Sequence, residues 1–190
     1  MTGIVDYGAG NLQSVANALD RVGAPYQVCR TPKQLEVMER IILPGVGHFG
    51  AAAKNLQDSG MAPVLLHHAS ADRPLLGICL GMQLLLETSD EATGTPGLGL
   101  LPGGNRRLTT RTVPHMGWNQ VQWERGDNHY YFAHSYAAAP LDPGDVLATV
   151  EQDGRTFPAV IGRGAILGLQ FHPEKSGAPG LALLEEFCRC

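Results

Sequence analysis

The sequence predicts an α/β fold, with a mostly parallel open sheet, helices on both faces and an antiparallel extension. In the first half of the chain, short apolar runs without polar alternation are followed by helical patterns, which is typical of buried parallel strands. In the second half, strand-like segments follow one another with Gly- and Asp-containing turns between them, which indicates antiparallel pairing. No repeat or linker interrupts the 190 residues, so we expect residues 1–190 to form one domain.

The first half divides into strands and helices by its hydrophobic pattern. In the first helical stretch, Leu12, Val15 and Leu19 recur at a spacing that places them on one face. Pro32 stands where proline commonly opens a helix. The predicted strands are Gly3–Tyr7, Tyr26–Cys29, Arg40–Leu43 and Leu75–Ile78. The predicted helices are Asn11–Val22, a short one from Pro32, Ala51–Asp58, Ala62–Ala69 and Gly81–Thr88.

The second half is predicted to contain a series of strands and a closing helix, Leu181–Phe187. Asp153-Gly154 lies between two of these strands and is a hairpin signal. The predicted strands are Thr109–Val113, Asn119–Trp123, Tyr130–His134, Val146–Glu151, Phe157–Gly162 and Ala165–Phe171.

The composition excludes several classes of protein. Hydrophobic residues make up 44% of the chain and charged residues 17%, which excludes a disordered segment and a coiled coil. A net charge of −4, without a run of Lys or Arg, argues against a nucleic-acid partner. The longest apolar run, around Met82–Leu86, is far shorter than the roughly 20 residues that span a bilayer. Because the chain also lacks a signal-peptide pattern, we expect a cytoplasmic protein without a membrane partner.

Neither a redox cofactor nor a metal is expected. Gly8 and Gly10 follow the first strand as in a dinucleotide-binding loop, but Gln13 stands at the third glycine position and Arg30 replaces the acidic residue. The cysteines lack both the secretory context that favours disulfides and a second Cys/His pair at zinc spacing. These cysteines are Cys29, Cys79, Cys188 and Cys190.

The segment Gly77-Ile78-Cys79-Leu80-Gly81 has the pattern of a nucleophile elbow with cysteine in place of serine. The glycines permit a sharp turn between strand and helix, which leaves the Cys79 thiol exposed at the end of the sheet. The helix N-terminus favours the thiolate, and the amide of Leu80 points toward the oxyanion that forms on an attacked carbonyl. The alternative is a buried core cysteine at a strand end.

A cysteine nucleophile needs a base, and His172 is the best candidate. It ends an apolar strand, and Glu174 follows two residues later beyond the rigid Pro173, so Glu174 can accept a hydrogen bond from the imidazole and fix its tautomer. His67 and His68 lie in a helical stretch and are predicted to be surface residues. The remaining histidines, which lack an acidic neighbour at this spacing, are His48, His115, His129 and His134.

The segment Leu43-Pro44-Gly45-Val46-Gly47-His48 follows the third strand. Its closely spaced glycines and free backbone amides suit an oxyanion hole or an anion-binding loop. The alternative is an ordinary turn between a strand and a helix.

Together the motifs resemble a known family. Gly77–Gln83 and Phe171–Glu174 are similar to the corresponding segments of the class I (triad) glutamine amidotransferases. Further segments resemble the glutaminase subunits of imidazole glycerol phosphate synthase, of histidine biosynthesis. These segments are Asp6–Asn11, Pro44–Gly50, Pro114–Asn119 and His172–Ser176. Because the matches extend over nearly the whole chain, the resemblance implies the amidotransferase fold.

The resemblance implies hydrolysis of glutamine to glutamate and ammonia. Cys79 would form a thioester with the substrate, His172 would transfer the protons, and Glu174 would orient His172. The positions that match substrate-binding or oxyanion-hole residues of the family are Gly45, Val46, Gly47, Leu80 and Gln83.

The resemblance also implies a heterodimer with a (β/α)8-barrel cyclase that activates the glutaminase. The cyclase would join the ammonia to a phosphorylated ribulosyl intermediate and yield imidazole glycerol phosphate and an aminoimidazole carboxamide ribotide. Thr112 stands where the family has lysine, and the Gly103–Thr112 loop is rich in arginine, which affects the expected cyclase contact and not the chemistry. The positions expected at or near the interface are Asn11, Trp118, Tyr131, His134 and Lys175.

Other functions compete with this interpretation. The chain could be the glutaminase of another synthase or a stand-alone amidase. A pyridoxal-type glutaminase has Pro-Gly-Gly-Glu-Ser after the third strand, where this chain has Pro44-Gly45-Val46-Gly47-His48. A non-catalytic α/β binding module would be favoured by the loss of the cysteine, histidine or glutamate of the triad, and all three residues are present.

Overall fold

A computed structural model describes residues 1–189, and within them the main sheet has nine strands in the order β2-β1-β3-β4-β12-β11-β10-β7-β8. The first five are parallel: β2 (Tyr26–Cys29), β1 (Thr2–Val5), β3 (Arg40–Gly45), β4 (Leu75–Cys79) and β12 (Ile166–Leu169). The other four continue the sheet in antiparallel pairing: β11 (Arg155–Arg163), β10 (Val146–Gln152), β7 (His115–Trp123) and β8 (Asn128–His134). The predicted fold class is therefore confirmed.

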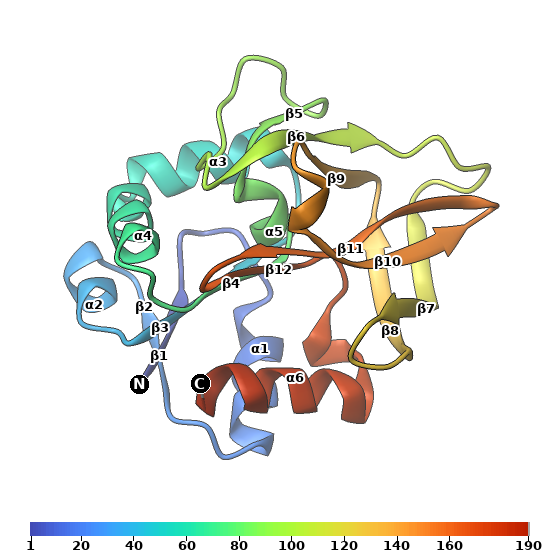
Figure 1. Ribbon diagram of the computed structural model, residues 1–190. Helices are drawn as coiled ribbons and strands as arrows, with labels where there is room; N and C mark the ends of the chain where they lie inside the picture. The colour runs from blue at the N-terminus through green and yellow to red at the C-terminus, as the bar shows by residue number, and fades with distance from the viewer. Residues whose placement is uncertain (190) are drawn as a thin grey trace.

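Helices cover both faces of the parallel part (Figure 1). One face carries α1 (Leu12–Arg21) and α6 (Gly177–Arg189), and the other carries α2 (Pro32–Glu36), α3 (Phe49–Asp58), α4 (Met61–Ser70) and α5 (Leu80–Leu84). Along β3, Ile42 packs into the cluster under α1 and α6, whereas Ile41 and Leu43 pack into the cluster under α3 and α4. Because both faces of the central strands are buried, apolar residues occupy successive positions along them, as Ile41, Ile42 and Leu43 do in β3.

A second, three-stranded sheet consists of β5 (Leu86–Ser89), β6 (Leu101–Arg107) and β9 (Tyr136–Pro140). The predicted helix Gly81–Thr88 is wrong in its second half, because α5 ends at Leu84 and the following residues form β5. The Asn105 side chain donates to the carbonyls of Gln83 and Thr88 at 2.9 and 3.0 Å, and β5 pairs in parallel with β6. Long-range pairing therefore prevails over the local helical pattern.

The region before β7 also differs from the prediction. Gly103–Arg107 lies in β6, so the expected loop Gly103–Thr112 is a strand in its first part. The predicted strand Thr109–Val113 is irregular instead. The backbone N–H groups of Arg111 and Thr112 donate to the Asp153 carboxylate at 2.9 and 3.2 Å, so a side chain satisfies them in place of a neighbouring strand. The strand β9 was not predicted.

The Asp153-Gly154 hairpin is confirmed. Gln152 pairs with Arg155 across it, and both turn residues have positive φ, 54° and 76°, as a type I′ turn requires. The closing helix is also present, and it extends from Gly177 to Arg189. Two 3₁₀ turns, Pro143–Asp145 (η1) and Pro173–Lys175 (η2), complete the described elements.

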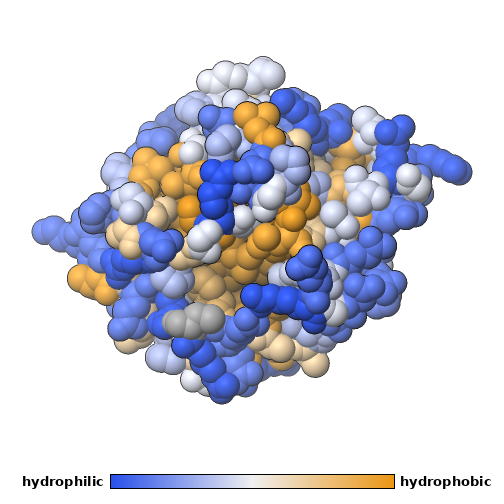
Figure 2. Space-filling model, in the orientation of Figure 1, coloured by the Kyte–Doolittle hydropathy of each residue, from blue (hydrophilic) through white to orange (hydrophobic). Residues whose placement is uncertain are grey.

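One apolar hollow, of about 350 Å³, lies between α6 and the sheet. Figure 2 shows apolar side chains across the middle of this face of the molecule. The apolar side chains that line the hollow include Trp123, Leu147, Leu167, Leu183 and Phe187. Among residues 1–189, no helix combines the length and the apolar character needed to cross a membrane.

Candidate active site

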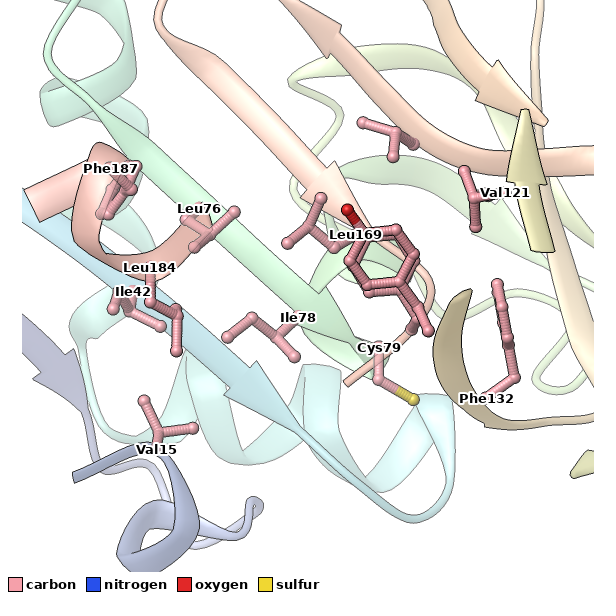
Figure 3. Packing of buried hydrophobic residues seen from close by; sticks show 14 of the residues in the cluster. Val15, Ile42, Leu76, Ile78, Cys79, Val121, Phe132, Leu169, Leu184 and Phe187 are labelled. Atoms are coloured by element: carbon pink, nitrogen blue, oxygen red, sulfur yellow. The ribbon is translucent and has the colours of Figure 1, made fainter. Parts of the chain in front are cut away.

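Cys79 is the last residue of β4, and α5 begins at the next residue (Figure 3). Its φ of 55° is in the left-handed region, which marks a strained strand-to-helix turn. A Cβ atom on Gly81 would lie 1.8 Å from the Leu43 carbonyl oxygen, and one on Gly77 would lie 2.7 Å from the Gly81 carbonyl oxygen. Both glycines are therefore required by close backbone contact, as the elbow pattern predicts.

The Cys79 side chain is less accessible than expected. Cys79 is 6% exposed, and its sulfur points from the end of β4 toward β8 (Figure 3). There Sγ lies 3.8 Å from the Ala133 carbonyl oxygen. The prediction of an exposed thiol is corrected to a thiol that lines a cavity.

His172 and Glu174 form the expected pair. His172 Nδ1 lies 2.8 Å from Glu174 Oε1, and both side chains are almost fully buried. Neighbouring groups fix the backbone of this segment: the His172 N–H donates to the Tyr131 carbonyl at 2.8 Å, and the Ser176 hydroxyl donates to the His172 carbonyl at 2.6 Å. Because Ser176 Oγ also accepts from the Tyr131 N–H at 2.9 Å, β8 holds the pair in place.

The electrostatics connect Cys79 to this pair. Burial lowers the pKa of His172, but its interactions with Cys79 and Glu174 outweigh burial and raise it to about 9. Glu174 occupies Nδ1, so Nε2 is the ring nitrogen that remains to exchange a proton with Cys79, which lines the same cavity. The three side chains can therefore hold a thiolate, an imidazolium and a carboxylate in a row, an arrangement suited to nucleophilic attack on a carbonyl.

A cavity of about 290 Å³ opens beside these residues. Leu80, at the start of α5, lines it, and so do Val46 and Gly47 from the segment after β3. Gly45 instead ends β3 opposite Cys79, where a Cβ would lie 2.8 Å from the Gly81 nitrogen. Gly47 has a φ of 101° and open space around it, so the conformational freedom of the predicted oxyanion segment lies at Gly47.

Gln83 lines the same cavity with a fixed side chain. Its Nε2 group donates to the Tyr136 carbonyl at 2.9 Å and to Gln170 Oε1 at 3.2 Å. The amide oxygen of Gln83 is therefore left to accept a hydrogen bond from a bound molecule.

The polar residues of the site that sequence reasoning missed include Gln170 and Glu91. Gln170 is fully buried, with Nε2 4.0 Å from Cys79 Sγ. Glu91 lines the cavity and accepts from the Phe49 N–H at 2.6 Å. The single polar residue in the apolar run before His172 is a signal that could have pointed to Gln170, whereas no local pattern marks Glu91.

The predicted interface residues mostly lie around the cavity. Trp118 is 57% exposed and contacts Tyr131 edge to face, with ring centroids 6.3 Å apart. Lys175 Nζ lies 5.9 Å from the centre of the Tyr131 ring and also lines the cavity. The exposed Met116 adds apolar surface at the mouth. Asn11 is the N-cap of α1, where its side chain accepts from the Ser14 N–H at 3.4 Å.

His134, expected at or near the interface, lines the cavity and is only 5% exposed, with its ring packed against His115, Phe132 and Phe157. One histidine differs from its predicted placement. His68, predicted to lie on the surface with His67, is 2% exposed because its Nε2 atom lies 3.1 Å from the Pro74 carbonyl oxygen under α4. His67 is exposed as predicted.

The other cysteines lie away from this cavity. Cys29 is buried at the end of β2, and Cys188 Sγ accepts from the Thr2 hydroxyl at 3.6 Å. Cys190 lies outside the described residues. Within residues 1–189, no group of three or more His, Cys, Asp or Glu side chains is placed to hold a metal ion.

Known proteins resemble this chain over nearly its whole length. The family model described as glutamine amidotransferase class-I matches residues 3–189. A relative from Geobacillus kaustophilus, described as imidazole glycerol phosphate synthase subunit HisH, is 46% identical over 202 residues, which cover 98% of this chain and 95% of the relative. A relative from Desulfitobacterium hafniense with the same description is 45% identical and covers 98% and 93%.

Solved structures share the fold. A crystal structure of a glutamine amidotransferase superimposes with a TM-score of 0.82 at 23% identity, covering 100% of this chain and 99% of the other. The structure of PurLQS from Thermotoga maritima gives 0.76 at 20% identity, covering 99% and 97%. The matched fold, the elbow at Cys79 and the family match across residues 3–189 lead to one assignment. The chain belongs to the class I glutamine amidotransferase family.

Proposed function

We propose that the chain is the glutaminase subunit of imidazole glycerol phosphate synthase and supplies ammonia for histidine biosynthesis. The observation that carries this proposal is the cavity in which the strained Cys79 meets the buried His172–Glu174 pair. The relatives named as subunits of that synthase, at 45–46% identity, support the choice of synthase. We treat residues 1–190 as a single amidotransferase domain, and we place it in the cytoplasm because its cysteine nucleophile requires reducing conditions.

The first half of the reaction makes the thioester. The Cys79 thiolate attacks the side-chain amide carbon of glutamine, and the carbonyl oxygen becomes an oxyanion. The backbone N–H groups of Leu80 and of the Val46–Gly47 segment are the proposed donors to that oxyanion. As the intermediate collapses, the C–N bond breaks and the His172 imidazolium gives its proton to the departing ammonia.

The second half releases glutamate. His172, now neutral, accepts a proton from water, and the hydroxide attacks the thioester carbon. The C–S bond then breaks, which restores the Cys79 thiolate and the imidazolium. Glu174, 2.8 Å from Nδ1, stabilises the charged ring and keeps Nε2 directed at the sulfur throughout. Gln83 and Glu91 line the remainder of the cavity and offer acceptor oxygens to the amino-acid end of glutamine.

The partner in this proposal is a (β/α)8-barrel cyclase that receives the ammonia. The proposed docking surface is formed by the exposed Trp118 and Lys175 together with the half-buried Tyr131. Asn11, the N-cap of α1, is the other proposed contact. The direct test measures glutamate release from glutamine with and without a purified cyclase and its ribulosyl ligand. Turnover that depends on the cyclase supports the proposal, whereas full activity of the chain alone indicates a stand-alone amidase.

We expect the cyclase and its ligand to raise kcat of the glutaminase by about 10²–10³-fold, which is the usual effect of one oxyanion-hole donor. The mobile part is Gly47, whose positive φ strains any other residue but whose surroundings are open. Gly47→Ala should therefore fold and should reduce the activation ratio at least about tenfold, because the backbone is restricted to one arrangement. The ratio is measured from kcat with and without the partner.

Gly154→Ala is a matched control for this variant. Gly154 has a φ of 76° and open surroundings, but it lies in the β10–β11 hairpin. Its variant should keep the wild-type ratio. Equal ratios in wild type and Gly47→Ala would contradict the proposed switch.

Trp118→Ala should weaken binding to the cyclase by about 30-fold or more, because large exposed aromatic side chains are typical interface hot spots. The side chain is largely exposed in this chain, so its loss should leave the melting temperature nearly unchanged. Titration calorimetry with the cyclase measures the effect. Val37→Ala, which truncates a 71% exposed side chain after α2, is the control. If both variants bind equally well, Trp118 lies outside the interface.

A further inference from the structure

A pair of buried histidines beside the cavity has no part in the mechanism above. His115 on β7 and His134 on β8 face each other in the sheet register, and they are 4% and 5% exposed. The His115 ring stacks on Phe132 with centroids 4.6 Å apart and meets Phe157 edge to face. His134 lines the cavity that holds Cys79. A polar pair in such an apolar setting requires well-defined hydrogen bonds.

Asn119 fixes the outer end of a hydrogen-bond chain. Its Nδ2 group donates to the Glu151 carbonyl at 2.8 Å, and its Oδ1 atom accepts from the Gln120 N–H at 2.8 Å. These two bonds identify which atom of the amide is nitrogen. The second Nδ2 hydrogen is directed at His115 Nε2, 3.2 Å away, so this ring nitrogen is an acceptor.

The hydrogen bond from Asn119 to His115 determines which nitrogen carries the hydrogen in both rings. Because His115 Nε2 accepts, the ring carries its hydrogen on Nδ1 and donates to His134 Nε2 at 3.0 Å. His134 must then carry its hydrogen on Nδ1, which donates to the Tyr136 carbonyl at 2.8 Å. The same carbonyl accepts from Gln83 Nε2 at 2.9 Å. The hydrogen bonds thus all run in one direction, from Asn119 to the Tyr136 carbonyl that orients Gln83.

Both rings are held neutral. Burial lowers the pKa of His115 to about 4, and the charge of Asp153 opposes this shift. Burial also lowers the pKa of His134 to about 3; the Tyr136 carbonyl opposes this, while His115 and His172 add to it. The other charged groups on the cavity wall are Lys175 and Glu91. A proton on His134 Nε2 would face the His115 Nδ1–H group and add a second imidazolium near His172.

We propose that His115 is a positioning residue of the glutaminase, which holds His134 as a neutral ring with its hydrogen on Nδ1. In this state His134 anchors the Tyr136 carbonyl, which keeps the Gln83 amide oriented toward the substrate. The neutral ring also leaves the Cys79–His172 pair without a competing cation. The inference rests on the proposed glutaminase function for its kinetic part, but its structural part stands independently of activity.

Nitrogen-15 NMR of the wild-type chain tests the structural part. Long-range couplings of the ring nitrogens should show both histidines in the Nδ1–H tautomer, with no titration between pH 5 and pH 8. An Nε2–H tautomer in either ring, or titration within that range, would overturn the proposal. Because no turnover is needed, this result does not depend on what the enzyme hydrolyses.

Two substitutions test the kinetic part. His115→Phe keeps the stacking on Phe132 but removes the Nδ1–H donor, whereas His115→Asn can place an amide N–H at the same position. His115→Phe should lower kcat/KM about tenfold or more, because misplaced substrate-positioning groups cost up to about 10²-fold. It should also move the acidic limb of the pH profile to higher pH, because His134 Nε2 becomes free to take a proton.

His115→Asn should restore both the rate and the position of the acidic limb. Thermal melting of both variants separates a folding defect from a kinetic one. A folded His115→Phe variant with the wild-type pH profile would overturn the role of His115. A wild-type enzyme that does not hydrolyse glutamine would instead refute the proposed function and leave the NMR result standing.

Discussion

Cys79→Ala should lower glutamine hydrolysis by about 10⁵-fold or more, to the background of the assay, because the loss of a nucleophile disables the whole triad. The complex with the cyclase should still make product when ammonium salt is supplied. The two outcomes differ because the Cys79 thiol is needed to release ammonia, whereas the proposed cyclase chemistry lies on the other chain. Glutamate release and product formation, measured in the same preparation, give both numbers.

Cys29→Ala is the matched control for this prediction. Cys29 likewise stands at the carboxyl end of a strand, but it is fully buried, and β2 lies at the edge of the sheet, away from the cavity. Its variant should retain glutaminase activity. Residual turnover near the wild-type level in purified Cys79→Ala would refute the assignment of the nucleophile.

The parts of the site that the sequence predicts are those set by local rules. The turn at Cys79 is specified within five residues, because Gly77 and Gly81 are the only residue type that fits against Leu43 and the elbow backbone. Glu174 is likewise placed by its spacing from His172 across Pro173. Buried parallel strands can also be predicted from the sequence, since their apolar runs are continuous.

The parts that sequence reasoning misses depend on distant partners. The helix after Cys79 ends early because the Asn105 side chain, on β6, donates hydrogen bonds to the Gln83 and Thr88 carbonyls. His134 is buried because its partner His115 comes from another strand, and Glu91 reaches the cavity from the loop after β5. In each case the deciding contact joins segments whose pairing the sequence alone does not reveal.

The second large effect concerns His172 and Glu174. His172→Ala should lower kcat by about 10⁴-fold or more, because it removes the group that moves both protons. Glu174→Gln should cost roughly 10- to 100-fold less, since the amide oxygen can still accept from Nδ1 and only the charge is lost. The double variant should lose about as much as His172→Ala alone, because the two side chains act as one unit. A loss equal to the product of the single losses would show that they act independently.

The pH dependence of Glu174→Gln isolates the electrostatic role of Glu174. In the wild type, the interactions with Cys79 and Glu174 outweigh burial and raise the pKa of His172 to about 9, so the imidazolium persists below that pH. Removal of the Glu174 charge lowers this pKa, and the imidazolium is then lost at a lower pH. The alkaline limb of kcat/KM should therefore move to lower pH relative to the wild type. Titration of the substrate affects both enzymes equally and does not contribute to this difference. If the limb stays in place while kcat falls, Glu174 acts by orienting the ring and not by stabilising its charge.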